Sequence, residues 1–258
     1  MLHDARAASK VPGRDLTSGP RSASFSLRLP VPFGLGVVSA AVALISGGVD
    51  SAVLVAQLIK EGSMVHPLYV ATGMSWEPVE RQYLARYLTA IACDALLPLH
   101  VLNLPVSDIY GSHWSLSGEG APGYEAPDQD VYLPGRNLLL VGKAAIYCSL
   151  NKIERIAMGL LGGNPFPDAT DEFFYVLRRS LSLGLNARIF IERPFKTMHK
   201  EAVIALGRAL PLELTFSCIR PSDGLHCGDC NKCAERQRGF RDAGMIDRTT
   251  YAQARELV

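Results

Sequence analysis

The chain has 258 residues, of which 48% are hydrophobic and 20% charged, so its composition excludes a protein that is disordered throughout. Lys and Arg number 26 against 25 Asp and Glu, and this net charge of +1 gives no sign of a chain-wide surface for nucleic acid or an anionic membrane. We therefore expect neither as a partner. The length suits one mid-sized domain with a small addition. Six cysteines are too few for a secreted disulfide scaffold, which predicts a reducing compartment.

Residues 1–36 are rich in Arg, Ser and Pro, lack a periodic pattern, and are expected to form a disordered leader. A targeting peptide and a start placed too far upstream are the alternatives. The uncharged run at 29–49 is long enough for a membrane span. Pro30 and Pro32 interrupt this run, and it ends in a polar Gly-rich turn, so a buried strand at 37–45 explains its apolar part better.

From residue 37 onward, apolar runs that suit strands alternate with segments of helical periodicity. We expect strands at 37–45, 64–70, 96–102, 153–160 and 189–191, and helices at 50–61, 78–92, 138–150, 171–183 and 198–210. This alternation predicts an α/β fold with a doubly wound, mostly parallel sheet and helices on both faces. A long functional loop is expected at 105–130. The pattern ends at Pro211, so we expect an α/β domain at 37–210 and a small C-terminal segment at 211–258.

A turn with two glycines, from Ser46 to Ser51, joins the first predicted strand to the first predicted helix. In a doubly wound sheet this junction is where a helix N-terminus meets phosphates, and glycines let the backbone approach an anion. The turn lacks the Gly-Lys-Ser/Thr of a Walker A loop and the third glycine of the dinucleotide fingerprint. A plain turn with Ser or Asp at the helix N-cap is the alternative to an anion site.

The complete string, Ser-Gly-Gly-Val-Asp-Ser, resembles the PP-loop of ATP pyrophosphatases, which cleave ATP between the α and β phosphates. The resemblance implies ATP with Mg²⁺ as the cofactor, and Asp50 would help to hold the Mg²⁺, which prefers oxygen ligands. The segment that would cradle the phosphates comprises Ile45, Ser46, Gly47, Gly48, Val49, Asp50, Ser51, Ala52, Val53, Leu54 and Val55.

Four cysteines gather near the C-terminus with the spacing Cys218-x8-Cys227-x2-Cys230-x2-Cys233. Two overlapping Cys-x-x-Cys turns and one more distant cysteine can place four thiolates around one ion, which predicts a single structural zinc. An iron–sulfur cluster is the main rival, and a redox-active disulfide would need only two of the sulfurs. His226 is expected near the metal rather than bound to it.

Two further groups of residues are expected to be structural. Cys93 and Cys148 lie in no motif and are expected on core helices. Arg236, Arg238 and Arg241 follow the cysteine cluster and are expected to form a solvated basic face, which at this net charge does not indicate RNA binding.

Five motifs in one order make the chain similar to the 7-cyano-7-deazaguanine (preQ0) synthase family, from Val38 to Tyr251. The PP-loop comes first and the cysteine cluster, preceded by Thr-Phe-Ser, comes last. Between them lie Leu-Pro-Gly-Arg-Asn-Leu at 133–138, Pro-Asp at 167–168 and Lys-Glu-Ala at 200–202. The resemblance implies an adenine nucleotide alpha hydrolase-like fold, a zinc-binding C-terminal segment, and a cytoplasmic protein that is often a homodimer.

The family's reaction turns a carboxylate into a nitrile, and the resemblance implies an ATP-dependent carbon–nitrogen ligase. The carboxylate of 7-carboxy-7-deazaguanine is adenylated, ammonia displaces AMP, and a second ATP activates the amide to give preQ0, a precursor of queuosine and archaeosine. AMP is a much better leaving group than a carboxylate oxygen, and Mg²⁺ with amide donors can stabilise the departing pyrophosphate.

Asp50, Arg136, Asp168 and Lys200 are the candidate catalytic residues that the resemblance implies. Arg136 can pair with a phosphate or the substrate carboxylate through its planar fork, and a surface salt bridge is the alternative. Asp168 can accept N–H donors from a guanine-like edge or bind metal, or it can cap the helix at 171–183. Lys200 can stabilise phosphate charge, or it is a solvated lysine in the first turn of a helix.

Two stretches depart from the family pattern, at 71–80 and at 162–166, where the substrate would sit. A relative that adenylates another carboxylate, or that couples a deazaguanine to another amine, is therefore an alternative. A PP-loop tRNA-modifying enzyme is a second, although the sequence has no evident RNA-binding extension or catalytic cysteine pair. A nucleotide-sensing protein without turnover is a third, and the intact Asp50 and Ser51 argue against it.

Overall fold

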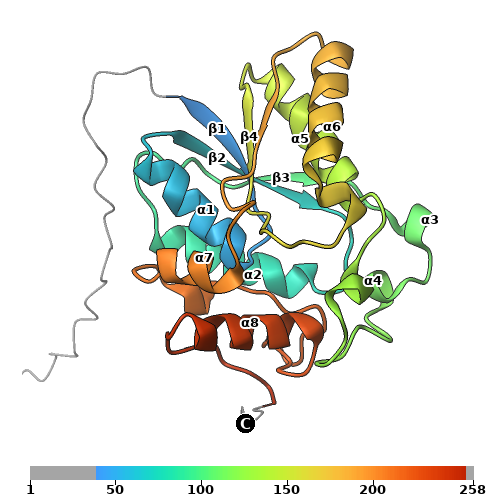
Figure 1. Ribbon diagram of the computed structural model, residues 1–258, viewed down its shortest axis with the longest axis vertical. Helices are drawn as coiled ribbons and strands as arrows, with labels where there is room; N and C mark the ends of the chain where they lie inside the picture. The colour runs from blue at the N-terminus through green and yellow to red at the C-terminus, as the bar shows by residue number, and fades with distance from the viewer. Residues whose placement is uncertain (1–38, 254–258) are drawn as a thin grey trace, which may run out of the picture.

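The computed structural model describes residues 39–253. The leader expected at 1–36 lies outside the described residues, as do the first two residues of the strand predicted at 37–45 and the end of the C-terminal segment. Within the described part, the alternating strands and helices form one central sheet, and the C-terminal segment lies below it in Figure 1.

The sheet has five parallel strands in the order β3-β2-β1-β4-β5. The first strand lies at the centre, and the chain winds outward to one edge before it returns to wind toward the other. Such a sheet is doubly wound, as predicted, and its ligands bind at the carboxyl ends of the strands on either side of the reversal, here β1 and β4. The strands are β1 (Ala40–Leu44), β2 (Met64–Ala71), β3 (His100–Asn103), β4 (Arg155–Met158) and β5 (Phe190–Glu192).

Both faces of the sheet are buried under helices, as the prediction required (Figure 1). Successive side chains of β1 point to opposite faces, so Ala41 and Ala43 join one hydrophobic cluster while Val42 and Leu44 join the other. The sequence of a central parallel strand is therefore an uninterrupted run of apolar residues. One face is covered by α1 (Val49–Lys60), α2 (Glu77–Ala90) and α7 (Lys200–Leu206), and the other by α5 (Arg136–Leu150) and α6 (Asp171–Gly184).

Strand β3 begins later than the sequence predicts, at His100 instead of residue 96. Leu96 makes only an isolated bridge to Val65. Pro98 follows, and because proline has no backbone N–H it cannot continue the ladder.

The expected long loop at 105–130 contains two single-turn helices, α3 (Ser107–Tyr110) and α4 (Trp114–Ser117), and leads into a 3-10 turn, η1 (Asp128–Val131). The C-terminal segment contains the turn η3 (Leu212–Leu214) and a helix that the sequence did not predict, α8 (Asn231–Asp242). Helix α8 is charged along most of its length, so it lacks the apolar periodicity that reveals a helix in a sequence.

Helix α8 is held by close packing on α7 rather than by a broad apolar face (Figure 1). A Cβ added at Gly239 would lie 2.4 Å from Cγ of Lys200 and 2.8 Å from Cδ1 of Ile204. Glycine is therefore needed where the two helices touch.

The two isolated cysteines differ in position. Cys148 is buried on α5, as expected, whereas Cys93 lies after the end of α2 and is half-buried. The expectation that Cys93 lies on a helix was wrong, although it does pack against the core.

Within residues 39–253, no helix is both long and apolar enough to cross a membrane. The described part of the uncharged run at 29–49 forms β1 and the turn after it.

Replacing a core leucine of α1 tests the packing of the sheet. Leu58 is fully buried, so Leu58→Ala removes packed methyl groups and is expected to lower the free energy of unfolding by about 2–5 kcal/mol. Leu183→Ala on α6 is the matched control: its side chain is 74% exposed, and we expect a change within about 0.5 kcal/mol. Urea denaturation followed by circular dichroism measures both. Equal losses in the two variants would contradict this description of the core.

Candidate functional site

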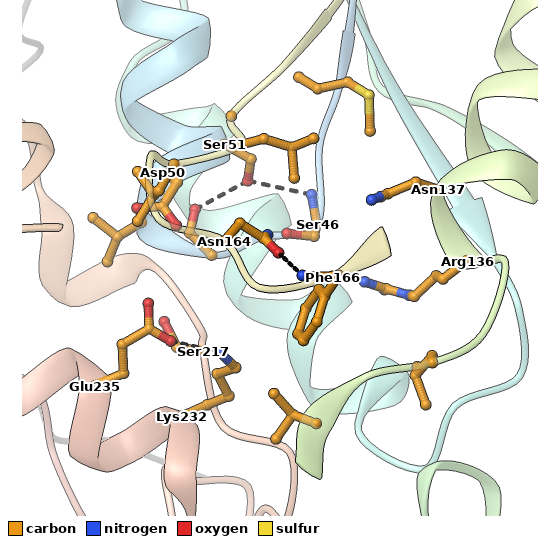
Figure 2. Close-up of a pocket in the computed structure, with 18 of the residues that line it drawn as sticks. Ser46, Asp50, Ser51, Arg136, Asn137, Asn164, Phe166, Ser217, Lys232 and Glu235 are labelled. Carbon is orange, nitrogen blue, oxygen red and sulfur yellow. Dashed lines mark hydrogen bonds and ion pairs between the residues drawn. The ribbon is translucent and has the colours of Figure 1, made fainter. Parts of the chain in front are cut away.

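A cavity of about 380 Å³ opens at the carboxyl ends of β1 and β4, where the fold is expected to bind a ligand. Figure 2 shows Ser46, Asp50 and Ser51 on one side of it and Arg136 and Asn137 on the other, with Lys232 and Glu235 of α8 below. The cavity therefore combines residues from both halves of the sheet and from the C-terminal segment.

The turn between β1 and α1 is fixed by hydrogen bonds among its own residues and by one from the C-terminal segment. The Ser51 hydroxyl accepts a hydrogen bond from the Ser46 amide at 3.2 Å and donates one to the Gly48 carbonyl at 3.0 Å. Gly47 has φ +80°, a conformation that favours glycine, and its carbonyl accepts a 2.7 Å hydrogen bond from the Phe216 amide of the C-terminal segment. The N-terminus of α1, with its positive dipole end, faces the cavity.

A third glycine, which sequence reasoning missed, lets the end of β4 lie against this turn. A Cβ added at Gly159 would lie 2.8 Å from the carbonyl carbon of Asp50 and 3.0 Å from the amide nitrogen of Ser51. Only a residue without a side chain fits between the two backbones. The available signal was its position, because Gly159 directly follows the buried strand β4 at the point where the winding of the sheet reverses.

The carboxylate of Asp50 begins a chain of charges that joins three helices. Lys200 Nζ lies 2.7 Å from Asp50 Oδ2 and 2.8 Å from Glu235 Oε1, and Lys232 Nζ lies 2.6 Å from Glu235 Oε2. Burial opposes the charged form of Lys200, but the two carboxylates outweigh it and raise the pKa of Lys200. Burial also opposes the charged form of Glu235, but the two lysines outweigh it and lower the pKa of Glu235. The alternative of a solvated Lys200 is excluded.

Arg136 and Asp168 lie across the cavity from the turn, at the N-terminus of α5. The Asp168 carboxylate accepts a 2.9 Å hydrogen bond from the Asn137 amide, and the Asn137 side chain donates to the Asp168 carbonyl at 2.9 Å. Asp168 therefore holds the start of α5, and the predicted cap of α6 is wrong: Thr170 accepts from the Phe173 amide instead. Within residues 39–253 the buried Nε of Arg136 has no hydrogen-bond partner, so a donor remains for a ligand.

Two glutamates in the first turn of α2, which the sequence did not single out, are buried, and Glu80 lies beside Gly47 of the turn after β1. The Glu77 carboxylate accepts hydrogen bonds from the amide and hydroxyl of Thr72, both at 2.8 Å, and from the Gly73 amide at 3.1 Å. Glu80 lines the cavity and accepts a 2.7 Å hydrogen bond from the Tyr69 hydroxyl. Burial raises the pKa of Glu80 to about 8 against smaller opposing effects of Tyr69 and Arg136.

Aromatic side chains form two walls of the cavity. Trp76 stacks on Trp114 with ring centroids 5.9 Å apart, and Tyr132 packs on Phe166 at 5.1 Å. Both stretches that depart from the family pattern, at 71–80 and at 162–166, contribute residues to the lining. The departures therefore lie around the cavity.

The four clustered cysteines are buried, and their sulfur atoms all lie within 4.8 Å of one another. Sulfurs at about 2.3 Å from a tetrahedral zinc are about 3.8 Å apart. The separations of 3.9 Å between Cys227 and Cys233 and 3.8 Å between Cys230 and Cys218 match that value. The amides of Cys227 and Arg220 both point at the Cys218 sulfur from 3.3 Å, an arrangement that suits a thiolate ligand. The cluster fits a metal ion.

His226 and Arg236, which lie in the same segment as the cysteines, are both buried. Nε2 of His226 accepts a hydrogen bond from the Ser217 amide at 3.1 Å, and burial, followed by the charge of Arg236, lowers the pKa of His226 to about 2. Arg236 is 2% exposed and donates to the Thr215 and Thr249 hydroxyls and the Leu212 carbonyl, each at 2.8 Å. The expectation that Arg236 belongs to a solvated basic face was wrong.

The structure sorts the residues expected around the phosphates into two groups, except for Gly47. Gly47 belongs to neither group, and its carbonyl is bound by the Phe216 amide. Those that line the cavity are Ile45, Ser46, Gly48, Val49, Asp50 and Ser51, together with Arg136, Asp168 and Lys200. The side chains of Ala52, Val53, Leu54 and Val55 instead lie in the core. The Ala52 amide bonds to the Gly48 carbonyl at 3.0 Å, because by this position the helix uses its own donors. The part of the expected cradle that faces the cavity therefore ends at Ser51.

Residues 40–244 match the family described as queuosine biosynthesis protein QueC. Two curated relatives, each named 7-cyano-7-deazaguanine synthase, are 30% identical to this chain. The relative from Methanopyrus kandleri aligns over 82% of this chain and 98% of its own length, and the one from Desulfotalea psychrophila over 81% and 96%. A solved structure described as a predicted subunit of tRNA methyltransferase from Methanocaldococcus jannaschii is 16% identical, with a TM-score of 0.43 over 67% of this chain and 75% of that chain.

Gly159→Ala tests the close approach of β4 to α1. The added methyl group meets backbone atoms that cannot rotate away, so we expect the free energy of unfolding to fall by about 1–3 kcal/mol. Gly142→Ala in α5 is the control: no atom lies within 4 Å of the added Cβ, and alanine favours a helix by about 0.5–1 kcal/mol. The midpoints of thermal and urea denaturation should therefore fall for Gly159→Ala and rise for Gly142→Ala. A stabilised Gly159→Ala protein would contradict the packing.

The raised pKa of Glu80 predicts a stability that falls with pH. The folded protein keeps the Glu80 proton up to about pH 8, whereas the unfolded chain releases it near the ordinary value of 4.5. Between these values the unfolded state binds fewer protons, so stability falls by up to about 1.4 kcal/mol per pH unit from this group. Glu80→Gln should remove that slope, and Glu125→Gln, at an exposed site, should retain it. Urea denaturation at several pH values measures the difference, and parallel curves for wild type and Glu80→Gln would contradict the assignment.

Proposed function

The chain belongs to the family of queuosine biosynthesis protein QueC, and on that basis we propose that it is an ATP-dependent carbon–nitrogen ligase. Its substrates are 7-carboxy-7-deazaguanine and ammonia, and its product is 7-cyano-7-deazaguanine. The observation that carries the proposal is a PP-loop turn that faces a cavity whose opposite side holds an arginine with an unused donor.

The turn after β1 would bind the phosphates of ATP, which supplies AMP as a leaving group for the carboxylate oxygen. The N-terminal amides and dipole of α1 and the hydroxyl of Ser46 favour negative charge there. Within the described residues the buried Oδ1 of Asp50 has no hydrogen-bond partner, which suits a ligand of Mg²⁺. Lys200 would hold Asp50 in place through an ion pair with the other carboxylate oxygen of Asp50, Oδ2.

The opposite side of the cavity would hold the substrate. Arg136 lines it with a free N–H and can pair with the substrate carboxylate, or with the phosphate of the adenylate formed from it. The two aromatic pairs, Trp76 with Trp114 and Tyr132 with Phe166, suit a flat bicyclic base, because a planar ring stacks favourably on aromatic faces. Asp168, engaged by Asn137, would position Arg136 rather than react.

A second candidate is a ligase that adenylates another carboxylate or joins a deazaguanine to a different amine. The observation in its favour is that both stretches that depart from the family pattern line the cavity. A change of substrate would leave the PP-loop and the cysteine cluster intact.

ATP–pyrophosphate exchange tests the proposal. Exchange that depends on 7-carboxy-7-deazaguanine, followed on addition of ammonia by a nitrile detected by mass spectrometry, is expected. Exchange without a nitrile, but with a new adduct when primary amines replace ammonia, would favour the second candidate. ATP binding with neither exchange nor product would overturn both, and salt-sensitive binding of tRNA would then favour a tRNA-modifying enzyme.

We also propose that the cysteine cluster binds one structural zinc in a reducing, cytoplasmic environment, since four thiolates leave no open coordination position. Cys230→Ser should lose the metal and unfold the C-terminal segment, because zinc binding contributes about 10–16 kcal/mol to such small segments. Cys93→Ser, at a half-buried position away from the cluster, should keep the zinc. Metal analysis by mass spectrometry and thermal denaturation measure both effects. A well-folded metal-free protein, or iron in place of zinc, would contradict the assignment.

A further inference from the structure

We propose that Glu80 accepts the proton that the incoming ammonia, or another amine, must lose when the carbon–nitrogen bond forms. This inference rests on the proposed ligase function and adds a residue to its second step.

The step requires a proton acceptor near the reacting carbon. When the nitrogen lone pair attacks the carbonyl carbon of the adenylated substrate, an N–C bond forms and the nitrogen becomes positively charged. Unless this nitrogen loses a proton, it leaves again as ammonia more readily than the AMP group leaves. Transfer of one proton to a carboxylate leaves a neutral nitrogen, the C–O bond to AMP then breaks, and AMP departs with the electron pair.

The position of Glu80 suits this role. Glu80 lies on the first turns of α2 and lines the same cavity as the turn after β1 and Arg136. Its side chain lies directly against that turn, because a Cβ added at Gly47 would be 3.0 Å from Cγ of Glu80. A nucleophile that reaches an adenylate held between the turn and Arg136 would therefore pass close to this carboxyl group.

The other carboxyl groups of the cavity lining are engaged or solvated. Asp50 and Glu235 are paired with lysines, and Asp168 accepts the Asn137 amide. Asp128 lies at an exposed position and accepts a hydrogen bond from Asn231. Within residues 39–253, Glu80 has no salt bridge, and its one hydrogen-bond donor is the Tyr69 hydroxyl.

The groups around Glu80 also set its proton affinity. Tyr69 on β2 and Arg136 on α5 favour the carboxylate, whereas burial and the neighbouring Glu77 on α2 favour the protonated form, and the resulting pKa is about 8. Glu77 itself is held by three donors from Thr72 and Gly73. A base whose pKa lies near the working pH both accepts and releases a proton readily.

Glu80→Gln tests the proposal, because glutamine keeps the shape of the side chain and its amide oxygen can still accept a hydrogen bond from the Tyr69 hydroxyl. Substrate-dependent ATP–pyrophosphate exchange without ammonia should stay within about threefold of wild type. Product formation with ammonia should fall by about 10²–10⁴-fold. Hydroxylamine is a strong nucleophile that is unprotonated at neutral pH, so it should restore product formation in Glu80→Gln to within about tenfold of wild type. Tyr69→Phe is the second variant: at a constant concentration of unprotonated ammonia, loss of the donor should move the rising limb of the pH profile for product formation to higher pH.

The outcomes separate this inference from the proposed function. If wild type shows no substrate-dependent exchange, the ligase function fails and the inference falls with it. If wild type is active and Glu80→Gln keeps its rate with ammonia, Glu80 is only an acceptor for Tyr69 and the inference is overturned. Equal losses of exchange and of product, with no recovery in hydroxylamine, would assign Glu80 to adenylation and also overturn it.

Discussion

The close contact between the end of β4 and the first turn of α1 is the constraint on which the site depends. Gly159 has no room for a side chain beside the backbone of Asp50 and Ser51, and Gly47 has none beside Glu80. The turn is therefore enclosed by β4 on one side and by α2 on the other. This enclosure fixes the helix N-terminus, and with it the direction in which its amides and the Asp50 carboxylate point into the cavity.

The C-terminal segment completes the cavity as well as the fold. The Phe216 amide holds the Gly47 carbonyl, while α8 supplies Lys232 and Glu235, which continue the ion pairs from Asp50 through Lys200. Helix α8 has few apolar residues, so its place depends on the buried Arg236 and on the cysteine cluster at its start. A metal bound there would therefore stabilise the segment and also keep two charged groups beside the PP-loop turn.

The acidic residues around the cavity are held in different ways. Asp168 and Glu77 accept backbone amides and act as braces, whereas Asp50 and Glu235 are neutralised by lysines. Among the described residues, Glu80 alone of these five is buried in the cavity lining with neither a salt bridge nor a backbone amide as a partner; its donor is the Tyr69 hydroxyl. This division follows from the partners that surround each carboxyl group, because all five are the same chemical group.

The sequence by itself determined the doubly wound α/β fold, the PP-loop turn and the cluster of four cysteines that fits a metal ion, because periodicity and short-range spacing carry this information. It did not reveal that Gly159 touches α1, that Asp168 braces α5, that Arg236 is buried, or that α8 exists. Each of these depends on contacts between segments far apart in the chain, and for α8 those contacts replace an apolar face. The tertiary structure likewise decided that the part of the expected phosphate cradle that faces the cavity ends at Ser51 and that Glu80 faces the cavity, since burial and hydrogen-bond partners are set only when distant elements meet.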